Sequence, residues 1–569
     1  MMLLKTIFNR GFLDQFNSNK ALKLNISQEF RSSIEKKSPH VDILYIFVYH
    51  HTKSHKMKTK FTIFVLFCAG MLFGQNKIFQ TAINENNLKS NQKVSRELSS
   101  SYLVTKYYSQ APFNLKSDLQ INLPTGKEIT AKFSRSLTYS NKSESYIYTI
   151  ENDPRAELVL SQYDRVVTGM YASGTGEKVI FHQTDANVFA LSEVSDSTIL
   201  NQDSIDDYVM DKNENFNKAN SNVCLSTTPI CPATRVDVMV VFTTAAKTAW
   251  GGLSQSNSFV ATAITNFNTA LTNSGVSNVT INLVYSGEIS YTESGSLSTD
   301  LPRLRNNNDG YMDDVHTLRT TYGADLCALV TSTPTNTCGL GYVNTSSTNY
   351  SSNSGFCVSL YNCAVSNYSL AHELGHNMGL RHDWYVDSST TPCDHHHGYT
   401  NKKAIDLGTL STSSQRWRTI MAYNDECSSK GFNCTRINRW ANPDINYNSD
   451  PTGVAIGNTK PANEAFGFAR FACVVSNFMP ETQSFLATKE AIHETQEFLL
   501  YPNPAHNMIQ ISGNRTGKYS FKVYNSAGQN VISTTETTIH LKGLTSGEYF
   551  LSIYDDKNSL IESKKFIVR

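Results

Sequence analysis

Three histidines and one glutamate stand together in a short segment, His372-Glu373-Leu374-Gly375-His376-Asn377-Met378-Gly379-Leu380-Arg381-His382. His372 and His376 are four residues apart, so on a helix their imidazoles project from the same face about one turn from each other. Two imidazoles at this separation can bind one tetrahedral metal ion. The spacing therefore predicts a helix that carries two ligands of a metal site.

Gly379 and His382 complete the predicted site. Glycine tolerates a positive φ, so Gly379 can end the helix and turn the chain until His382 reaches back as a third ligand. Three protein ligands leave one position for water, and zinc lowers the pKa of such a water towards about 7. Glu373 stands beside the ligands and is the expected general base for this water, and then the acid for the leaving amine. The segment predicts peptide-bond hydrolysis at one zinc ion.

Two other interpretations of this segment are a helix with solvated histidines and a closed structural zinc site. A bare H-E-x-x-H string arises by chance, whereas the string with its glycine and third histidine is far rarer. Closed structural sites usually have cysteine in the fourth position. The full string therefore favours an open, catalytic site.

Alternating strands and helices are expected around the histidine segment. An apolar run at 236–242 is typical of a buried strand. Further strands are expected at 279–285 and 326–331, and helices at 258–272, 312–322 and 463–478. This alternation predicts a mixed α/β sheet domain over residues 231–480.

The histidine string resembles that of the metzincin metalloproteases. Asp383, directly after the third histidine, resembles the adamalysin or reprolysin branch, and residues 309–316 and 323–326 resemble bacterial reprolysin-like domains. Residues 419–423 resemble the Met-turn of this clan, in which Met421 would form a hydrophobic floor under the metal. The resemblance covers about residues 235–480. It implies a metzincin-type fold, with a mixed, mostly parallel sheet and an active-site helix, and a zinc metalloendopeptidase that acts on proteins.

Tyr423 departs from the reprolysin pattern. A tyrosine two places after the Met-turn methionine resembles astacins and serralysins, where it approaches the metal, whereas Asp383 argues against those branches. Tyr423 is therefore a candidate fifth ligand or transition-state hydrogen-bond donor, and a packed aromatic side chain is the alternative. The resemblance also places residues 339–343 at the edge strand that pairs with extended substrate.

The N-terminal part of the sequence contains a predicted signal for secretion. A basic start at residues 57–60 precedes a short apolar run at 61–73, so residues 57–75 are expected to be a secretory signal peptide. This run is shorter than a membrane-spanning helix, which needs about 20 apolar residues. An uncleaved membrane anchor is the alternative interpretation. Residues 1–56 show no globular pattern, and we expect them to be a mis-assigned extension of the gene start.

Residues 76–230 are expected to be a β-rich propeptide. Stretches at 127–133, 145–150 and 178–182 alternate with the period of strands, and cleavage is expected between residues 217 and 235.

Ten of the eleven cysteines lie between Cys224 and Cys473, which predicts up to five disulfides and an oxidising compartment, with buried thiols as the alternative. One hypothesis for how the uncleaved chain is kept inactive is that Cys224 or Cys231 occupies the open position of the metal. The alternative, which is favoured, is that both cysteines form disulfides.

The C-terminal residues form a separate unit. Short alternating strands at 498–569, after a linker at 481–497, predict a small β-sandwich. Residues 501–504, 523–528 and 543–550 resemble the C-terminal sorting domain of type IX secretion. This resemblance implies passage through the outer-membrane secretion machinery and a secreted protein, either extracellular or attached to the bacterial cell surface. A carbohydrate-binding or adhesive module is the alternative.

Composition excludes one class of partner and leaves one competing function. A hydrophobic fraction of 40% with 17% charged residues is typical of globular domains. A net charge of +1 without a basic patch argues against nucleic acid. The competing function is a surface adhesin on an inactive protease scaffold, although every expected catalytic position is filled. The run His395-His396-His397 is expected to be a surface loop rather than a second metal site.

Overall fold

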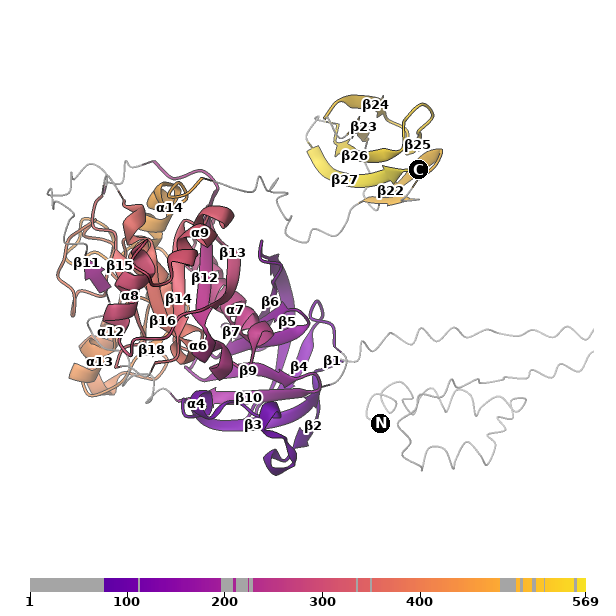
Figure 1. Cartoon of the computed structure of the whole chain (residues 1–569). Coiled ribbons are helices and arrows are strands. Elements are labelled where there is room, and N and C mark those ends of the chain that lie inside the picture. The colour runs from indigo at the N-terminus through magenta and orange to yellow at the C-terminus, as the bar shows by residue number, and fades with distance from the viewer. Residues whose placement is uncertain are drawn as a thin grey trace, which may run out of the picture. The chain divides into compact units, whose positions relative to one another are not determined.

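The computed structural model describes residues 76–110, 113–195, 208–210, 224, 229–333, 336–347, 350–480, 498–501, 505–513, 518–525, 528–556 and 560–569. The predicted signal peptide, the expected extension at 1–56 and most of the expected cleavage region lie outside these residues. No helix within the described ranges is long and apolar enough to cross a membrane. The described chain forms a large sheet, an α/β domain and a pair of C-terminal sheets (Figure 1).

The first of these is a ten-stranded, almost entirely antiparallel sheet in the order β1-β4-β5-β6-β7-β8-β9-β10-β3-β2. Its strands are β1 (Asn76–Lys77), β2 (Phe79–Ile83), β3 (Tyr102–Gln110), β4 (Leu119–Asn122), β5 (Glu128–Thr138), β6 (Glu144–Ile150), β7 (Asp153–Tyr163), β8 (Val166–Ala172), β9 (Lys178–Asp185) and β10 (Val188–Val194). Alternation along the strands places Tyr148, Leu158 and Phe181 in a core on one face. The strands expected at 127–133, 145–150 and 178–182 are confirmed.

The α/β domain is built on a six-stranded sheet in the order β11-β15-β16-β14-β12-β13. The strands are β11 (Tyr208–Met210), β12 (Thr234–Thr243), β13 (Val279–Ile289), β14 (Leu326–Thr331), β15 (Gly339–Val343) and β16 (Phe356–Leu360). Only β15 and β16 pair in the antiparallel sense, so the sheet is mixed and mostly parallel, as expected. The three predicted strands correspond to β12, β13 and β14, whose apolar runs are buried because both faces of the sheet are covered.

Helices cover this sheet on both sides. Those in contact with its strands are α6 (Thr244–Ala249), α7 (Leu253–Asn273), α8 (Leu297–Arg305), α9 (Asp313–Tyr322), α10 (Tyr361–Ala364), α11 (Ser369–Asn377) and α14 (Glu464–Val475). Two further helices, α12 (Lys402–Leu407) and α13 (Asp425–Ser429), contact each other. The helices predicted at 258–272, 312–322 and 463–478 are confirmed as α7, α9 and α14.

Helix α7 lies between the two sheets, in contact with β13 on one side and with β7 and β8 on the other (Figure 1). Every residue from Ser256 to Leu271 is buried. The Ser258 hydroxyl donates to the carbonyl oxygen of Ser161, at 2.7 Å, and the hydroxyls of Tyr139 and Thr265 are 2.8 Å apart. The ten-stranded sheet and the α/β domain therefore share one hydrophobic core along this helix.

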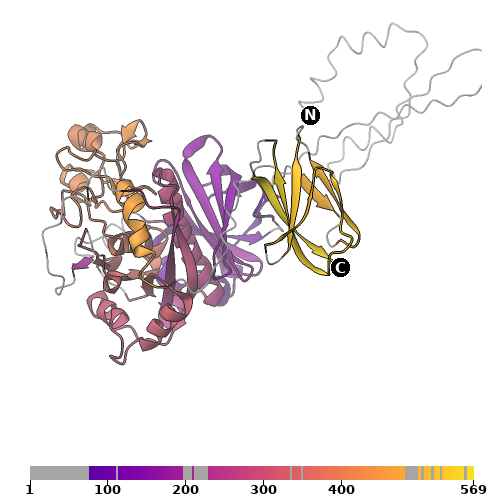
Figure 2. The same cartoon turned by 90° about the horizontal axis from the view of Figure 1, so that it is seen from above.

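The C-terminal residues form two sheets with a core of their own (Figure 2). One contains β21 (Phe498–Tyr501), β22 (Met508–Gly513) and β25 (Thr538–His540), and the other contains β23 (Ser520–Asn525), β24 (Asn530–Thr534), β26 (Gly547–Tyr554) and β27 (Leu560–Val568). Ile509 of the first sheet and Leu551 and Phe566 of the second are fully buried between them. This arrangement agrees with the small β-sandwich expected from the strand pattern.

Four disulfides form among the described cysteines, which agrees with the expectation of up to five. They join Cys224 to Cys393, Cys231 to Cys473, Cys338 to Cys363, and Cys427 to Cys434. Both Cys224 and Cys231 are bonded, which confirms the disulfide alternative for them.

The remaining two cysteines, Cys327 of β14 and Cys357 of β16, are free and buried. The strands are neighbours, but Cys327 pairs with Phe356, and Cys357 pairs with Ala328. This offset of one residue points the two thiols to opposite faces of the sheet, where each packs in a different core. The fifth disulfide is therefore excluded by strand register.

Candidate metal centre

The structure brings the three predicted histidines together. Helix α11 carries His372 and His376, and the chain turns after it so that His382 returns to the same side. The Nε2 atom of His382 lies 3.3 Å from that of His372 and 3.0 Å from that of His376. One nitrogen from each ring lies within 4.8 Å of the other two, and all three side chains are buried. This is the arrangement that the spacing predicts.

The outer nitrogens of two rings are held by backbone carbonyls. Nδ1 of His372 lies 2.9 Å from the carbonyl oxygen of Ile420, and Nδ1 of His376 lies 2.9 Å from that of Leu380. A carbonyl only accepts, so each contact favours the tautomer with its proton on Nδ1 and leaves the Nε2 lone pair directed at the centre. Neutral imidazoles with converging Nε2 atoms fit a metal ion.

Two glycines make the turn and the packing feasible. Gly379 has a φ of +87°, and a Cβ there would overlap the Tyr350 hydroxyl. Gly375 faces the Met-turn, because a Cβ on it would lie 2.9 Å from the sulfur of Met421. Met421 is fully buried against α11, where the resemblance predicts the floor of the site.

Asp383 connects the histidine string to the Met-turn. One carboxylate oxygen accepts from the backbone N–H of Tyr423 at 2.8 Å, and the other accepts from that of Tyr385 at 3.0 Å. Burial raises the pKa of Asp383, while these two hydrogen bonds oppose the rise. In the sequence Asp383 served only as a family marker. Its structural role depends on a partner forty residues away, which no local pattern indicates.

Tyr423 lies beside the histidines. Its ring centroid is 4.5 Å from that of His382 and 5.9 Å from that of His372, in edge-on orientations. The guanidinium carbon of Arg436 lies 5.8 Å from the same ring. The ring of Tyr423 therefore lies next to two of the three histidines.

The predicted catalytic residue, Glu373, lies against strand β15. A Cβ on Gly339 would overlap the Glu373 carboxylate, and a Cβ on Gly341 would lie 3.2 Å from its Oε2 atom. The Gly-Leu-Gly start of β15 therefore lets the strand pass directly beside this carboxylate. Sequence reasoning assigned these residues to the substrate edge but missed why they are glycines.

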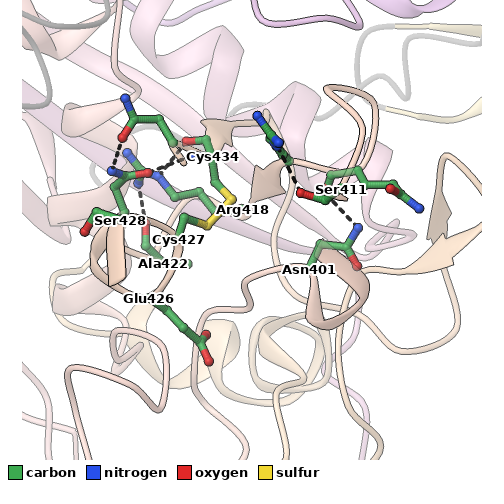
Figure 3. The surroundings of a disulfide bond; sticks show 12 residues. Asn401, Ser411, Arg418, Ala422, Glu426, Cys427, Ser428 and Cys434 are labelled. Atoms are coloured by element: carbon green, nitrogen blue, oxygen red, sulfur yellow. Dashed lines mark hydrogen bonds between the residues drawn. A yellow bond between two sulfur atoms is a disulfide. The ribbon is translucent and has the colours of Figure 1, made fainter. Parts of the chain in front are cut away.

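A disulfide stiffens the loop that follows the Met-turn (Figure 3). Cys427 and Cys434 are bonded, and the buried Arg418 donates from Nε to the carbonyl oxygen of Cys434, at 3.2 Å. The same guanidinium donates to the carbonyl oxygen of Ala422, next to Met421. Arg418 therefore ties the Met-turn to the disulfide loop.

The expectation that His395, His396 and His397 form a surface loop is wrong. All three are fully buried. Nδ1 of His396 lies 3.0 Å from the carbonyl oxygen of Gly379, and Nδ1 of His397 lies 2.5 Å from that of His382. Their rings support the turn that carries the third histidine. Burial lowers the pKa of His395 to about 4, which keeps that imidazole neutral near pH 7.

Cys393, His395 and His396 also approach one another as a metal site would. The Cys393 sulfur is bonded to Cys224, so it cannot act as a thiolate ligand. His395 and His396 instead pack against Phe466 and Phe471 of α14.

Two family models match the chain. The model described as Metallo-peptidase family M12, a reprolysin model, matches residues 233–434, and that of the secretion system C-terminal sorting domain matches residues 499–569. The first range contains the histidine string and the Met-turn, which confirms the reprolysin-like resemblance. The second confirms the sorting domain and indicates export.

Curated relatives share the name peptidyl-Asp metalloendopeptidase. The protein of Stenotrophomonas maltophilia (strain R551-3) is 43% identical over 226 residues, which is 39% of this chain and 48% of that protein. The Xanthomonas campestris pv. campestris protein is 41% identical over the same shares. The chain thus spans about half the length of these relatives.

A shorter relative is matched almost completely. The peptidyl-Asp metalloendopeptidase of Pseudomonas fragi is 35% identical over 191 residues, which cover 94% of that protein and 33% of this chain. Both this match and the M12 model agree with the buried histidine triad on α11. The chain belongs to metallopeptidase family M12.

Proposed function

We propose that this protein is a zinc-dependent metalloendopeptidase in which His372, His376 and His382 bind one zinc ion. The observation that carries the proposal is the convergence of three buried imidazoles, two of them on the helix that also carries Glu373. When bound, zinc supplies a Lewis acid that lowers the pKa of water and polarises a peptide carbonyl. Three nitrogen ligands, with no cysteine grouped with them among the described residues, fit a catalytic rather than a structural ion.

Glu373 is the proposed general base and acid. Its carboxylate lies between α11 and strand β15, next to the position where a substrate bound to β15 would pass. From there it can take a proton from the attacking water and return it to the leaving amine. The backbone of β15 offers hydrogen bonds to an extended substrate, which gives affinity without strong side-chain selection.

Met421 and Tyr423 are proposed to support the histidines and the helix that carries two of them. Met421 packs against α11 at Gly375 and is proposed to fix the position of this helix. The hydroxyl of Tyr423 is proposed to donate a hydrogen bond to the oxygen on which negative charge develops, or to bind the metal as a fifth ligand. Asp383 holds the Tyr423 backbone in place through the 2.8 Å hydrogen bond.

We further propose a preference for aspartyl residues at the cleaved bond. The relatives named peptidyl-Asp metalloendopeptidase support it through 43% and 41% identity over the matched regions. An otherwise matched peptide pair with Asp or Asn at one position tests this preference directly, because the two side chains have the same shape and differ in charge.

The proposed organisation assigns each region a stage of export. A signal peptide at 57–75 and a propeptide at 76–230 precede the protease domain at 231–480, and the linker 481–497 leads to the sorting domain at 498–569. The sorting domain is proposed to engage the outer-membrane secretion machinery and to leave the protease outside the cell or on its surface. Its match to the sorting-domain model supports this route.

Glu373→Ala tests the proposed chemistry. We expect hydrolysis of casein and of the Asp peptide to fall by at least about 100-fold, because the general base is lost. Metal analysis should still find one zinc ion per chain, since the three histidines remain. Glu288→Ala, on an exposed part of β13, is the matched control and should retain activity.

Equal cleavage by Glu373→Ala and the unchanged chain would contradict the enzyme proposal and would favour the adhesin alternative. Loss of zinc together with activity would instead show that Glu373 is needed to build the site.

A further inference from the structure

Arg436 places a buried positive charge next to Tyr423. The residue is 3% exposed, and its guanidinium carbon lies 5.8 Å from the centroid of the Tyr423 ring. That centroid is 4.5 Å from the ring centroid of His382 and 5.9 Å from that of His372. Arginine is always charged in proteins. A permanent cation is therefore one aromatic ring away from two of the proposed metal ligands.

Two segments of the chain hold this guanidinium. Nη1 of Arg436 donates to the carbonyl oxygen of Asn367, two residues before α11, and Nη2 donates to that of Ala422 in the Met-turn, both at 3.3 Å. Both bonds are longer than is usual for N–H donors, and a neutral carbonyl group is a weaker acceptor for a guanidinium than a carboxylate is. An incoming carboxylate can therefore compete for these donors without breaking a strong hydrogen bond.

A second arginine adds positive charge at the same carbonyl group. Nη1 of the buried Arg418 also donates to the oxygen of Ala422 (Figure 3). Two guanidinium groups that share one carbonyl oxygen repel each other, and an anion next to them lowers this repulsion. The attraction is stronger here than at the surface, because the local dielectric constant of a buried region is low. The surroundings of Ala422 therefore favour a negatively charged side chain.

A cavity provides space next to Arg436. Arg436 lines it together with Tyr368, the residue that precedes α11, and with Lys178 of β9, whose Nζ lies 4.8 Å from the Tyr368 ring centroid. The guanidinium is thus not enclosed by packed side chains on every side and can shift towards a bound carboxylate. Four of the charged side chains that line the cavity are basic and one is acidic: Arg155, Lys178, Arg436, Arg439 and Glu157.

We propose that Arg436 is a specificity-determining residue that binds the aspartyl carboxylate of the substrate beside the cleaved bond. This role rests on the proposed protease function and on its proposed preference for aspartyl residues. The Tyr423 hydroxyl is proposed to contact the oxygen of the cleaved bond, so a side chain on the adjacent residue has to pass only this ring to reach the guanidinium. Its carboxylate then forms charge-assisted hydrogen bonds with Arg436. An asparagine of the same shape brings no negative charge and binds less tightly.

Matched peptides with Asp or Asn beside the cleaved bond test this role in the full chain. The unchanged chain is expected to have a kcat/KM at least about 100-fold higher for the Asp peptide. Arg436→Ala should lower this ratio to about 1 through loss of Asp cleavage, while cleavage of the Asn peptide persists. Arg436→Gln keeps an N–H donor for the two carbonyl groups and removes the charge, so it should lose the preference as well. Arg439→Ala is the matched control and should keep the ratio, because its guanidinium donates to the carbonyl oxygen of Asn273 on α7.

Chemical rescue separates charge recognition from packing. Millimolar guanidinium added to Arg436→Ala should raise kcat/KM for the Asp peptide by about tenfold and leave that for the Asn peptide unchanged, because the free cation occupies the place of the lost side chain. Equal rescue of both peptides would assign Arg436 to packing and overturn the proposal. Should Arg436→Ala fail to fold, Arg436→Gln carries the test.

Three results distinguish the possible failures. An Asp-to-Asn ratio in Arg436→Gln equal to that of the unchanged chain would overturn the role of Arg436 and leave the proposed preference intact. A ratio near 1 in the unchanged chain would overturn the preference and the role of Arg436 together. Full activity of Glu373→Ala is the separate result that contradicts the protease function itself.

Discussion

Tyr423 presents the edge of its ring to two of the three histidines, and its backbone is fixed by Asp383. These contacts separate the position of the ring from the function of its hydroxyl. Removing only the hydroxyl therefore leaves the packing and the hydrogen bond from the backbone in place. This makes Tyr423 the residue at which catalysis and structure are most cleanly distinguished.

Tyr423→Phe should lower kcat by about tenfold or more, because the proposed hydrogen bond to the developing negative charge is lost. Zinc content and thermal stability should stay unchanged, as the three histidines and the packed ring remain. Steady-state kinetics with the Asp peptide, together with metal analysis, provide the measurement. Undiminished turnover would leave Tyr423 as a packed aromatic side chain only.

Single residues also show what local spacing predicts. His372, His376 and His382 were identified because helix periodicity and one glycine determine where their rings lie. The burial of His395 to His397 was not predicted, because it follows from tertiary contacts, such as those of His396 and His397 with the carbonyl groups of Gly379 and His382. Contacts of this kind depend on the tertiary fold and leave no periodic pattern in the sequence.

At the scale of elements, the site depends on how closely β15 approaches α11. The absence of side chains at Gly339 and Gly341 lets the strand pass beside the Glu373 carboxylate. The same strand is paired on its other side with β16, so it cannot retreat without breaking the sheet. A side chain added at the strand must therefore displace the glutamate.

Gly339→Ala should reduce hydrolysis by at least about tenfold, because the added methyl group pushes the Glu373 carboxylate from its position. Zinc binding should persist, since the three histidines remain and the atoms nearest to the added methyl group belong to the Glu373 side chain. Gly547→Ala is a matched control, because a Cβ there meets nothing within 4 Å. Full activity of Gly339→Ala would show that the glutamate adjusts freely.

The pattern of elements was predictable where it followed strand and helix periods. Strands β12, β13 and β14 and helices α7, α9 and α14 correspond to their predicted ranges because each is an apolar run or an amphipathic stretch. Strand β11 was not predicted, since three residues in a polar segment carry no period. Its pairing depends on an edge strand more than a hundred residues later in the chain.

At the scale of the whole molecule, α7 has no exposed face along its central residues, because the ten-stranded sheet covers the side that the α/β domain leaves open. Phe259 and Ile264 of this helix belong to the core that also contains Met170 and Ile180 of the large sheet. Separation of the two parts would expose this shared surface to water. The sheet is therefore expected to assist folding of the domain that contains the metal centre.

Residues 231–480 expressed alone should refold with lower yield and unfold at a lower temperature than a chain spanning residues 76–480, because α7 loses its apolar cover. Adding residues 76–194 as a separate polypeptide should restore part of the yield. Removal of residues 498–569 is the control, since that sandwich has a core of its own. Circular dichroism during thermal unfolding gives the measurement, and equal melting temperatures for 231–480 and 76–480 would contradict the expectation.

The two free thiols in the central sheet bear on the timing of maturation. Burial raises the pKa of Cys327 to about 11 and that of Cys357 well above its usual value, so neither is a nucleophile once β14 and β16 have paired. Before that moment both thiols can compete for an oxidant with the eight cysteines that form the disulfides. Pairing of β14 with β16 before oxidation would therefore keep these two thiols out of the disulfides, which links the order of folding steps to the choice of cysteine pairs.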